Sequence, residues 1–191
     1  MGNFGVVADV SATLVAALDR ELGTLLPPAS AQLNDLAGDT PSGLVLTVTL
    51  YEIVEDGVSR NRADIRTGSG TSVLIRKPPM ALLLRYLLTP FGADAPSVHR
   101  MIGKAMQVLY DDSILDGLQL QGGLAGDTDT LKVTLAPMTL EERTRVWWAI
   151  QKPYRLSLNY EVRVVNLEAI ASRRVEVVRS RTLDTGPGVA S

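Results

Sequence analysis

The sequence predicts an α+β domain in which a mixed β-sheet is flanked by helices. Three segments carry apolar residues at steps of three and four, which is typical of amphipathic helices. Other segments are rich in β-branched residues or alternate apolar with polar positions, which is typical of strands. Because the two patterns alternate along the chain without a repeat of fixed period, we expect helices packed against one sheet.

The first helix is predicted over residues 6–25. Its apolar residues recur on one face, which should be buried. Pro27 and Pro28 should end the helix, since proline lacks the amide hydrogen that the next turn requires. The apolar face comprises Val7, Val10, Leu14, Leu18, Leu22 and Leu25.

Two strands are predicted in the middle of the chain. Residues 44–54 alternate aliphatic residues with threonine and tyrosine, so the two sets should face opposite ways. The polar, arginine-rich residues 59–70 should form an exposed loop. Residues 80–89 form a leucine-rich run, and periodicity allows either a buried helix or a buried strand. Their short length and flanking prolines favour a central strand.

Two further helices are indicated by their first residues. Ser97 is predicted to cap a helix that continues to Tyr110. Thr139 and Glu142 stand three positions apart, the spacing of a capping box, and should begin a helix that continues to Ile150.

Three strands are predicted in the last third of the chain. Residues 131–135 form a short alternating run. The longest strand is predicted over residues 154–167, with one buried face and one solvated face. Residues 173–182 are a further β-prone run before a glycine- and proline-containing end.

The adjacent Trp147 and Trp148 cannot share a core pocket, because neighbouring helical residues point about 100° apart. Trp147 falls on the apolar side of its helix and is the predicted core residue. Trp148 falls at the margin, where two interpretations stay open. It is either an anchor for a partner chain or a partly covered residue at the rim of the core.

Composition limits the function classes. A formal net charge of -2 argues against a dedicated nucleic-acid or anionic-membrane binder. No signal pattern or apolar run of about 20 residues is present, so we expect a soluble protein without a membrane span. Charged residues make up only 21% of the chain, which fits either apolar surface reserved for subunit contacts or a large core.

The search for chemistry predicts no catalytic, cofactor-binding or metal-binding residues and therefore no enzyme. The chain has no cysteine and one histidine, His99, which favours a structural role for that side chain. Asp111, Asp112 and Asp116 do not follow the spacing of a calcium loop. The glycine-rich residues 68–72 lack the lysine and helix start of a phosphate-binding loop.

Three blocks in order resemble a known family. They are residues 76–89 (RKPPMALLLRYLLT), residues 99–110 (HRMIGKAMQVLY), and Val146-Trp147 followed by residues 154–160 (YRLSLNY) and 162–165 (VRVV). Together with the first helix they are similar to the tail-terminator (cap) proteins of extracellular contractile injection systems of the Photorhabdus virulence cassette and antifeeding-prophage type. The resemblance spans roughly residues 6–170.

The resemblance implies a tail-terminator-like fold and a structural role. It implies a hexameric ring seated on the last layer of the sheath protein and the inner tube protein of a phage-tail-like particle. Such a ring ends polymerisation of both cylinders and joins them during contraction. A protein of this kind is made in the cytoplasm and becomes part of the assembled particle, without a cofactor, nucleic acid or membrane as partner.

We expect residues 1–171 to form the tail-terminator-like domain and residues 172–191 to form a C-terminal strand or arm with a flexible end. The strand has two interpretations: it pairs with acidic segments of the sheath, or it is an edge strand of the domain's own sheet. The candidate interface residues are Trp148, Arg173, Arg174, Val175, Val177, Arg179 and Arg181.

Two alternative functions stay open from the sequence. One is a baseplate or adaptor component of a phage-tail-like particle, which is also a structural role. The other is a small enzyme with an unrecognised site. A stable ring on the end of the particle would favour the structural functions over the enzyme.

Overall fold

The computed structural model describes residues 4–58, 62–68, 72–126, 128–170 and 172–176. A six-stranded sheet has the order β1-β2-β5-β8-β7-β6, in which β1 pairs parallel with β2 and the other pairs are antiparallel. This confirms the predicted α+β fold with a mixed sheet. The strands are β1 (Ser30–Leu33), β2 (Val45–Glu55), β5 (Met80–Phe91), β6 (Ile114–Asp116), β7 (Thr130–Leu135) and β8 (Leu158–Leu167).

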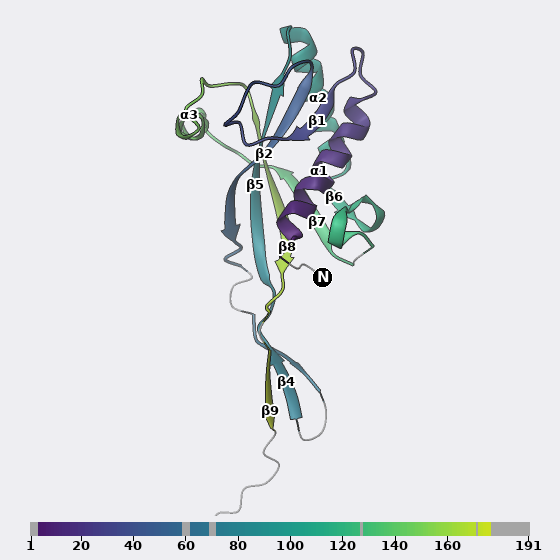
Figure 1. Cartoon of the computed structure of the whole chain (residues 1–191), viewed down its shortest axis with the longest axis vertical. Helices are drawn as coiled ribbons and strands as arrows, with labels where there is room; N and C mark the ends of the chain where they lie inside the picture. The colour runs from purple at the N-terminus through teal and green to yellow at the C-terminus, as the bar shows by residue number, and fades with distance from the viewer. Residues whose placement is uncertain (1–3, 59–61, 69–71, 127, 171, 177–191) are drawn as a thin grey trace, which may run out of the picture.

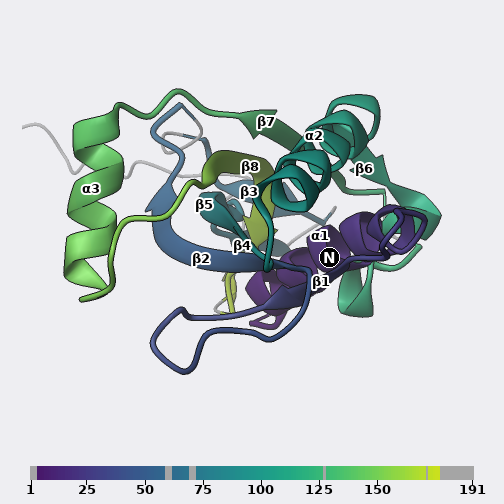
Figure 2. The ribbon, with the colours of Figure 1, turned by 90° about the horizontal axis from the view of Figure 1, so that it is seen from above.

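Helices cover both faces of this sheet. Helices α1 (Val6–Leu22) and α2 (Ala95–Asp111) lie side by side on one face, and α3 (Leu140–Ala149) lies on the other (Figure 2). The larger apolar core forms between the sheet and α1 and α2. A smaller core, made of Leu36, Leu87, Phe91 and Trp147, forms beneath α3.

The central strands are buried on both faces, which explains their composition. The run at residues 80–89 is strand β5, between β2 and β8, so the predicted central strand is confirmed. Tyr86 of β5 is fully buried, and its hydroxyl shares a 2.8 Å hydrogen bond with the Ser11 hydroxyl of α1. Burial raises the pKa of Tyr86 to about 12, so the phenol stays neutral in the core.

The threonines of β2 are also buried, on the face opposite to Leu46 and Val48. The Thr47 hydroxyl donates a 3.0 Å hydrogen bond to the carbonyl oxygen of Thr89 in β5. This bond satisfies a polar group in an interior position. The two predicted sets of β2 residues therefore face opposite ways, but both are covered.

Two helix boundaries differ from the prediction. Helix α1 ends at Leu22 instead of residue 25. Ser97 is not the cap of α2, because Asp94 holds that position and its carboxylate accepts a 2.8 Å hydrogen bond from the Ser97 amide. Hydrogen bonds from Ser97 lower the pKa of Asp94, which keeps the cap charged. Asp94 has the extended backbone and the carboxylate that an N-cap requires, so the helix begins before the predicted serine.

The strand predictions also need corrections. Strand β8 begins at Leu158 instead of residue 154, and its polar Asn159 is buried instead of solvated. Asn159 lies beside the α3 segment, where it accepts a 2.8 Å hydrogen bond from the Tyr51 hydroxyl. The short strands β1 and β6 lie in regions without a predicted strand.

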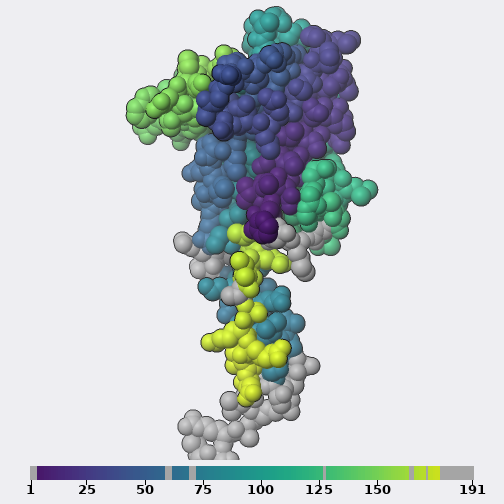
Figure 3. All heavy atoms as spheres, viewed as in Figure 1, coloured from purple at the N-terminus to yellow at the C-terminus, as the bar shows by residue number. Residues whose placement is uncertain are grey.

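A second sheet projects from one end of the domain (Figures 1 and 3). It is antiparallel, has the order β3-β4-β9, and is called the β-arm here. Its strands are β3 (Ile65–Thr67), β4 (Ser72–Arg76) and β9 (Ser172–Glu176). Because β3 lies within residues 59–70, the prediction that this whole segment is a loop is wrong.

The β-arm continues two strands of the main sheet. Strand β4 leads into β5, and β9 follows β8. Strand β4 pairs antiparallel with β9, just as β5 pairs antiparallel with β8. Between the pairs lie Pro78 and Pro79, which have no amide hydrogen to donate to a sheet ladder. The prolines therefore explain why the paired strands break into two sheets at this point.

Candidate assembly interface

The β-arm carries a strong positive charge. Its three strands contain four basic side chains and one acidic one, a net charge of +3, although the whole chain has a net charge of -2. The basic residues are Arg66, Arg76, Arg173 and Arg174. The domain thus presents a basic projection at one end, and this is a surface suited to an acidic partner.

Strand register places arginines beside apolar residues on one face of the β-arm. Arg66 and Arg173 stand opposite Ile75 from either side, and Val73 stands opposite Val175. Ile75, Val73 and Val175 are half-buried, while both arginines are exposed. The face therefore combines an apolar strip with two guanidinium groups, which suits contact with another chain.

The arginines of the main sheet differ from those of the arm. Arg85 forms ion pairs with Glu52 at 2.6 Å and Glu161 at 3.0 Å, and these partners raise the pKa of Arg85. By contrast, Arg173 and Arg174 form no ion pair with any residue that the structure describes. The positive charge of these two side chains is therefore left for a partner to neutralise.

Both edge strands of the β-arm have an open side in the described structure. Strand β4 lies in the centre, so β3 and β9 each pair on one side only. Unpaired amide and carbonyl groups on a sheet edge accept a further strand readily. Of the predicted interface residues in this region, Arg173, Arg174 and Val175 lie in β9. Val177, Arg179 and Arg181 lie outside the described residues.

Helix α3 holds one tryptophan in the core and leaves the other in solvent. The predicted capping box is present, and hydrogen bonds from the Thr139 amide and hydroxyl lower the pKa of Glu142. Trp147 is buried, which confirms its predicted core position, and its indole nitrogen donates a 3.4 Å hydrogen bond to the Ser157 hydroxyl. Trp148 is 81% exposed, so it is available to a partner.

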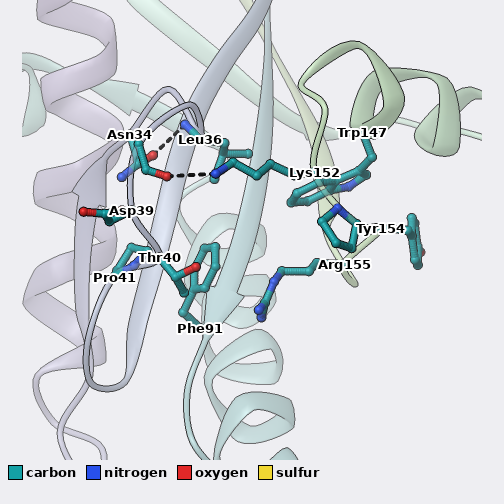
Figure 4. Close-up of a pocket in the computed structure, with 12 residues that line it drawn as sticks. Asn34, Leu36, Asp39, Thr40, Pro41, Phe91, Trp147, Lys152, Tyr154 and Arg155 are labelled. Atoms are coloured by element: carbon teal, nitrogen blue, oxygen red, sulfur yellow. Dashed lines mark hydrogen bonds between the residues drawn. The ribbon is translucent and has the colours of Figure 1, made fainter.

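A pocket of about 480 Å³ lies between α3 and the loop after β1 (Figure 4). The Arg155 guanidinium lies 4.8 Å from the centre of the Phe91 ring, a cation–π distance. Lys152 donates a 3.1 Å hydrogen bond to the Gly38 carbonyl oxygen. The pocket offers cations and aromatic rings but no nucleophile paired with a base, so its chemistry suits binding.

The part of the chain that the structure describes contains no group of three histidine, aspartate or glutamate side chains placed to hold a metal ion. His99 is exposed on α2. Among the described helices, none is long and apolar enough to cross a membrane.

Within the β-arm, the predicted interface residues lie on only one of the three strands, β9. Arg66 and Arg76 lie on β3 and β4, and no local pattern in the sequence connects them with Arg173. A signal was present in the clustered arginines of residues 59–76 and in the alternation at residues 72–76. Pairing between segments about 100 residues apart in sequence leaves no local pattern, so the cluster could not be assembled from periodicity.

Comparison with known proteins gives one family match and strong structural matches. The model of the Pvc16 N-terminal domain family matches residues 9–180. A search of curated proteins finds no match. Among solved structures, the chain is similar to the PVC sheath/tube terminator of an extracellular contractile injection system in its extended state. The TM-score is 0.63 and the identity 18%, over 97% of this chain and 64% of the terminator.

A second similar structure is the anti-feeding prophage cap, a tube-terminating cap. The TM-score is 0.59 and the identity 22%, over 93% of this chain and 59% of the cap. The chain thus spans less than two thirds of the length of either protein. At these identities the likeness establishes a shared fold.

Proposed function

Because the chain belongs to the Pvc16 N-terminal domain family, we propose that it is a structural cap of a phage-tail-like contractile injection system. As a tail terminator, it forms a ring that ends polymerisation of the tube and the sheath and joins the two. The observation that carries the proposal is the fold, which nearly the whole chain shares with a sheath/tube terminator.

The finer parts of the proposal are the ring and its partners. The chain assembles as a hexamer, binds the sheath protein and the inner tube protein, and acts without a cofactor or a catalytic step. It is made in the cytoplasm and becomes part of the particle. A low share of charged residues in the chain, an exposed Trp148 and a basic β-arm support an assembly role.

The distribution of sheet edges supports termination. A terminator has to satisfy the open edges of the last layer without offering an equivalent edge on its far side. The outermost strands of the main sheet are short: β1 has four residues and β6 has three. Such short strands are poor templates for a further strand. Strand β1 pairs only with Val45–Val48, so in the described structure the rest of β2 has an open side, and that part of β2 runs toward the end of the domain from which the β-arm projects. The longer open edges therefore lie toward one end of the molecule.

In this proposal β9 accepts or lends a strand at the last layer of the sheath, and Arg173 and Arg174 meet acidic side chains there. The described part of β9 is an edge strand of the β-arm and pairs with β4. Its other side remains open for a sheath segment. The two interpretations that the sequence left open are therefore compatible: an edge strand of the chain's own sheet can also be the contact strand.

Deletion of the gene in a producing strain tests the proposal. We expect tubes and sheaths of irregular, excessive length with open ends, and a return to uniform length when the intact chain is supplied. Electron micrographs of purified particles measure both. Particles that fail to start, without over-long tubes, would instead support a baseplate or adaptor role. Closed particles of normal length would contradict the cap.

A further inference from the structure

The two faces of strands β2, β5 and β8 differ in polarity. The face toward α1 and α2 is aliphatic and aromatic, and it builds the larger core. The face beneath α3 carries hydroxyl and amide side chains around two apolar ones, and it is called the polar face here. Its buried residues are Thr47, Thr49, Leu87, Thr89, Phe91 and Asn159. Helix α3 therefore covers a surface that is only partly apolar.

The buried polar groups beneath α3 are incompletely paired. Among the described residues, three buried side-chain atoms have no hydrogen-bond partner: Thr49 Oγ1, Thr89 Oγ1 and the Nε of Arg143, which belongs to α3. On the opposite face, by contrast, the buried hydroxyls of Ser11 and Tyr86 bind each other at 2.8 Å. An unpaired buried polar group disfavours the state that buries it. The docked position of α3 is therefore opposed by the groups that it covers.

Helix α3 belongs to a long connection between β7 and β8. Residues 136–157, called the strap here, leave β7, form α3 and return to β8 (Figure 2). Strands β7 and β8 pair directly, with Leu135 opposite Tyr160. The two ends of the strap are thus held together without α3. The strap can leave the sheet while this strand pair stays intact.

Few apolar side chains hold the strap on the sheet. Trp147 is the single buried residue of α3, and the partly buried Val146 and Ile150 pack beside it. Helices α1 and α2 have eight and five buried residues. An exposed hydrogen bond of 3.1 Å from Lys152 to the Gly38 carbonyl oxygen adds little, because water competes for both groups. Of the three helices, α3 is therefore the one held most weakly.

We propose that the strap detaches from the main sheet as a unit while the sheet, α1 and α2 stay folded. The docked state buries Trp147 and presents Trp148. The detached state presents both tryptophans and uncovers the polar face. A neighbouring chain with unequal affinity for the two states selects one of them, so the strap is a switch that assembly can set. This inference goes beyond the proposed function and rests on the fold alone.

The absence of cysteine from the 191 residues allows a thiol-labelling test on the full chain. Thr49→Cys places a thiol on the polar face, and the matched Val48→Cys places one in the larger core. The original side chains are 4% and 1% exposed. We expect a maleimide to label Thr49→Cys at least about tenfold faster, because the strap opens more often than the domain unfolds.

Urea unfolding of both variants corrects the labelling rates for any difference in global stability. A corrected ratio below about tenfold would overturn the strap, because both thiols would then become accessible together in unfolding of the domain.

Hydrogen exchange of the unaltered full chain gives a measure that needs no substitution. The amides of α3 should exchange at least about tenfold faster than the slowest amides of α1. Equal protection of the two helices would overturn the proposal. Fast exchange of α3 with a protected Thr49→Cys thiol would overturn it too, because the helix would then fray in place.

The threonines of the polar face offer a matched set of variants. Thr49→Val and Thr89→Val remove hydroxyls without a partner and should slow exchange of α3 about threefold or more, since the docked state no longer buries them unpaired. Thr47→Val removes a hydroxyl that donates a 3.0 Å hydrogen bond to the Thr89 carbonyl oxygen, and it should not slow exchange. Unchanged or faster exchange in the first two variants would contradict the strain beneath the strap.

Discussion

Truncation after Ala171 should abolish capping while leaving the domain folded. The truncation removes β9, which is one of the two β-arm strands with an open edge and carries Arg173 and Arg174. Neither apolar core contains a residue of β9, so thermal unfolding should shift little. Micrographs of particles made with the truncated chain should show tubes of irregular length, as after deletion of the gene. A truncated chain that still caps sheaths of normal length would exclude this segment as the terminating contact.

Charge reversal separates the role of the arginines from that of the strand. The double variant Arg173→Glu, Arg174→Glu keeps the backbone of β9. It should also give tubes of irregular length, because the introduced carboxylates would repel acidic groups of the partner. The matched control reverses two exposed charges elsewhere, Arg100→Glu and Lys132→Glu. Loss of capping on truncation but not on charge reversal would assign the contact to main-chain pairing instead of charge.

Trp147→Ala should lower the free energy of unfolding by about 3–5 kcal/mol, since it leaves a cavity that the surroundings fill only in part. Trp147 is the single buried residue of α3, so the cavity also removes the anchor that holds this helix on the sheet. Its contacts are with the small core of Leu36, Leu87 and Phe91. Urea unfolding followed by far-ultraviolet circular dichroism measures the loss without depending on tryptophan fluorescence.

The control is the neighbouring tryptophan. Trp148→Ala removes the same side chain from an exposed position and should change the free energy of unfolding by no more than about 0.5 kcal/mol. Similar losses in the two variants, measured as monomers, would show that both side chains stabilise the core.

Features set by local chemistry could be predicted from the sequence. The capping box at Thr139 depends on residues three positions apart, and it begins α3 as expected. Adjacent helical residues diverge whatever the surroundings, so the burial of Trp147 followed from geometry. Prolines on both sides of residues 80–89 made a helix unfavourable there, and β5 is the central strand.

Features set by tertiary contacts could not be predicted in this way. Strands β1, β3 and β6 have three or four residues and are defined by their partners, so they carry little periodicity of their own. Asn159 has a polar side chain on a predicted wet face, and it is buried because the α3 segment covers that face. The β-arm likewise required knowledge of which distant segments pair.

The sequence indicated four described residues of the candidate interface. The structure places Arg173, Arg174 and Val175 in the β-arm and Trp148 in an exposed position on α3. Their roles in binding stay predictions. The β-arm and α3 lie at separate places on the molecule (Figure 1). The two candidate surfaces are thus separate, and a partner on one need not cover the other.

The location of the chain on an assembled particle tests the central claim most directly. Electron cryomicroscopy of purified particles should resolve this fold as a closed ring at the end of the tube opposite to the baseplate, with the β-arm against the last sheath layer. A matched particle preparation from the deletion strain should lack that density. Density for this fold at the baseplate end, or repeated along the sheath, would contradict the cap.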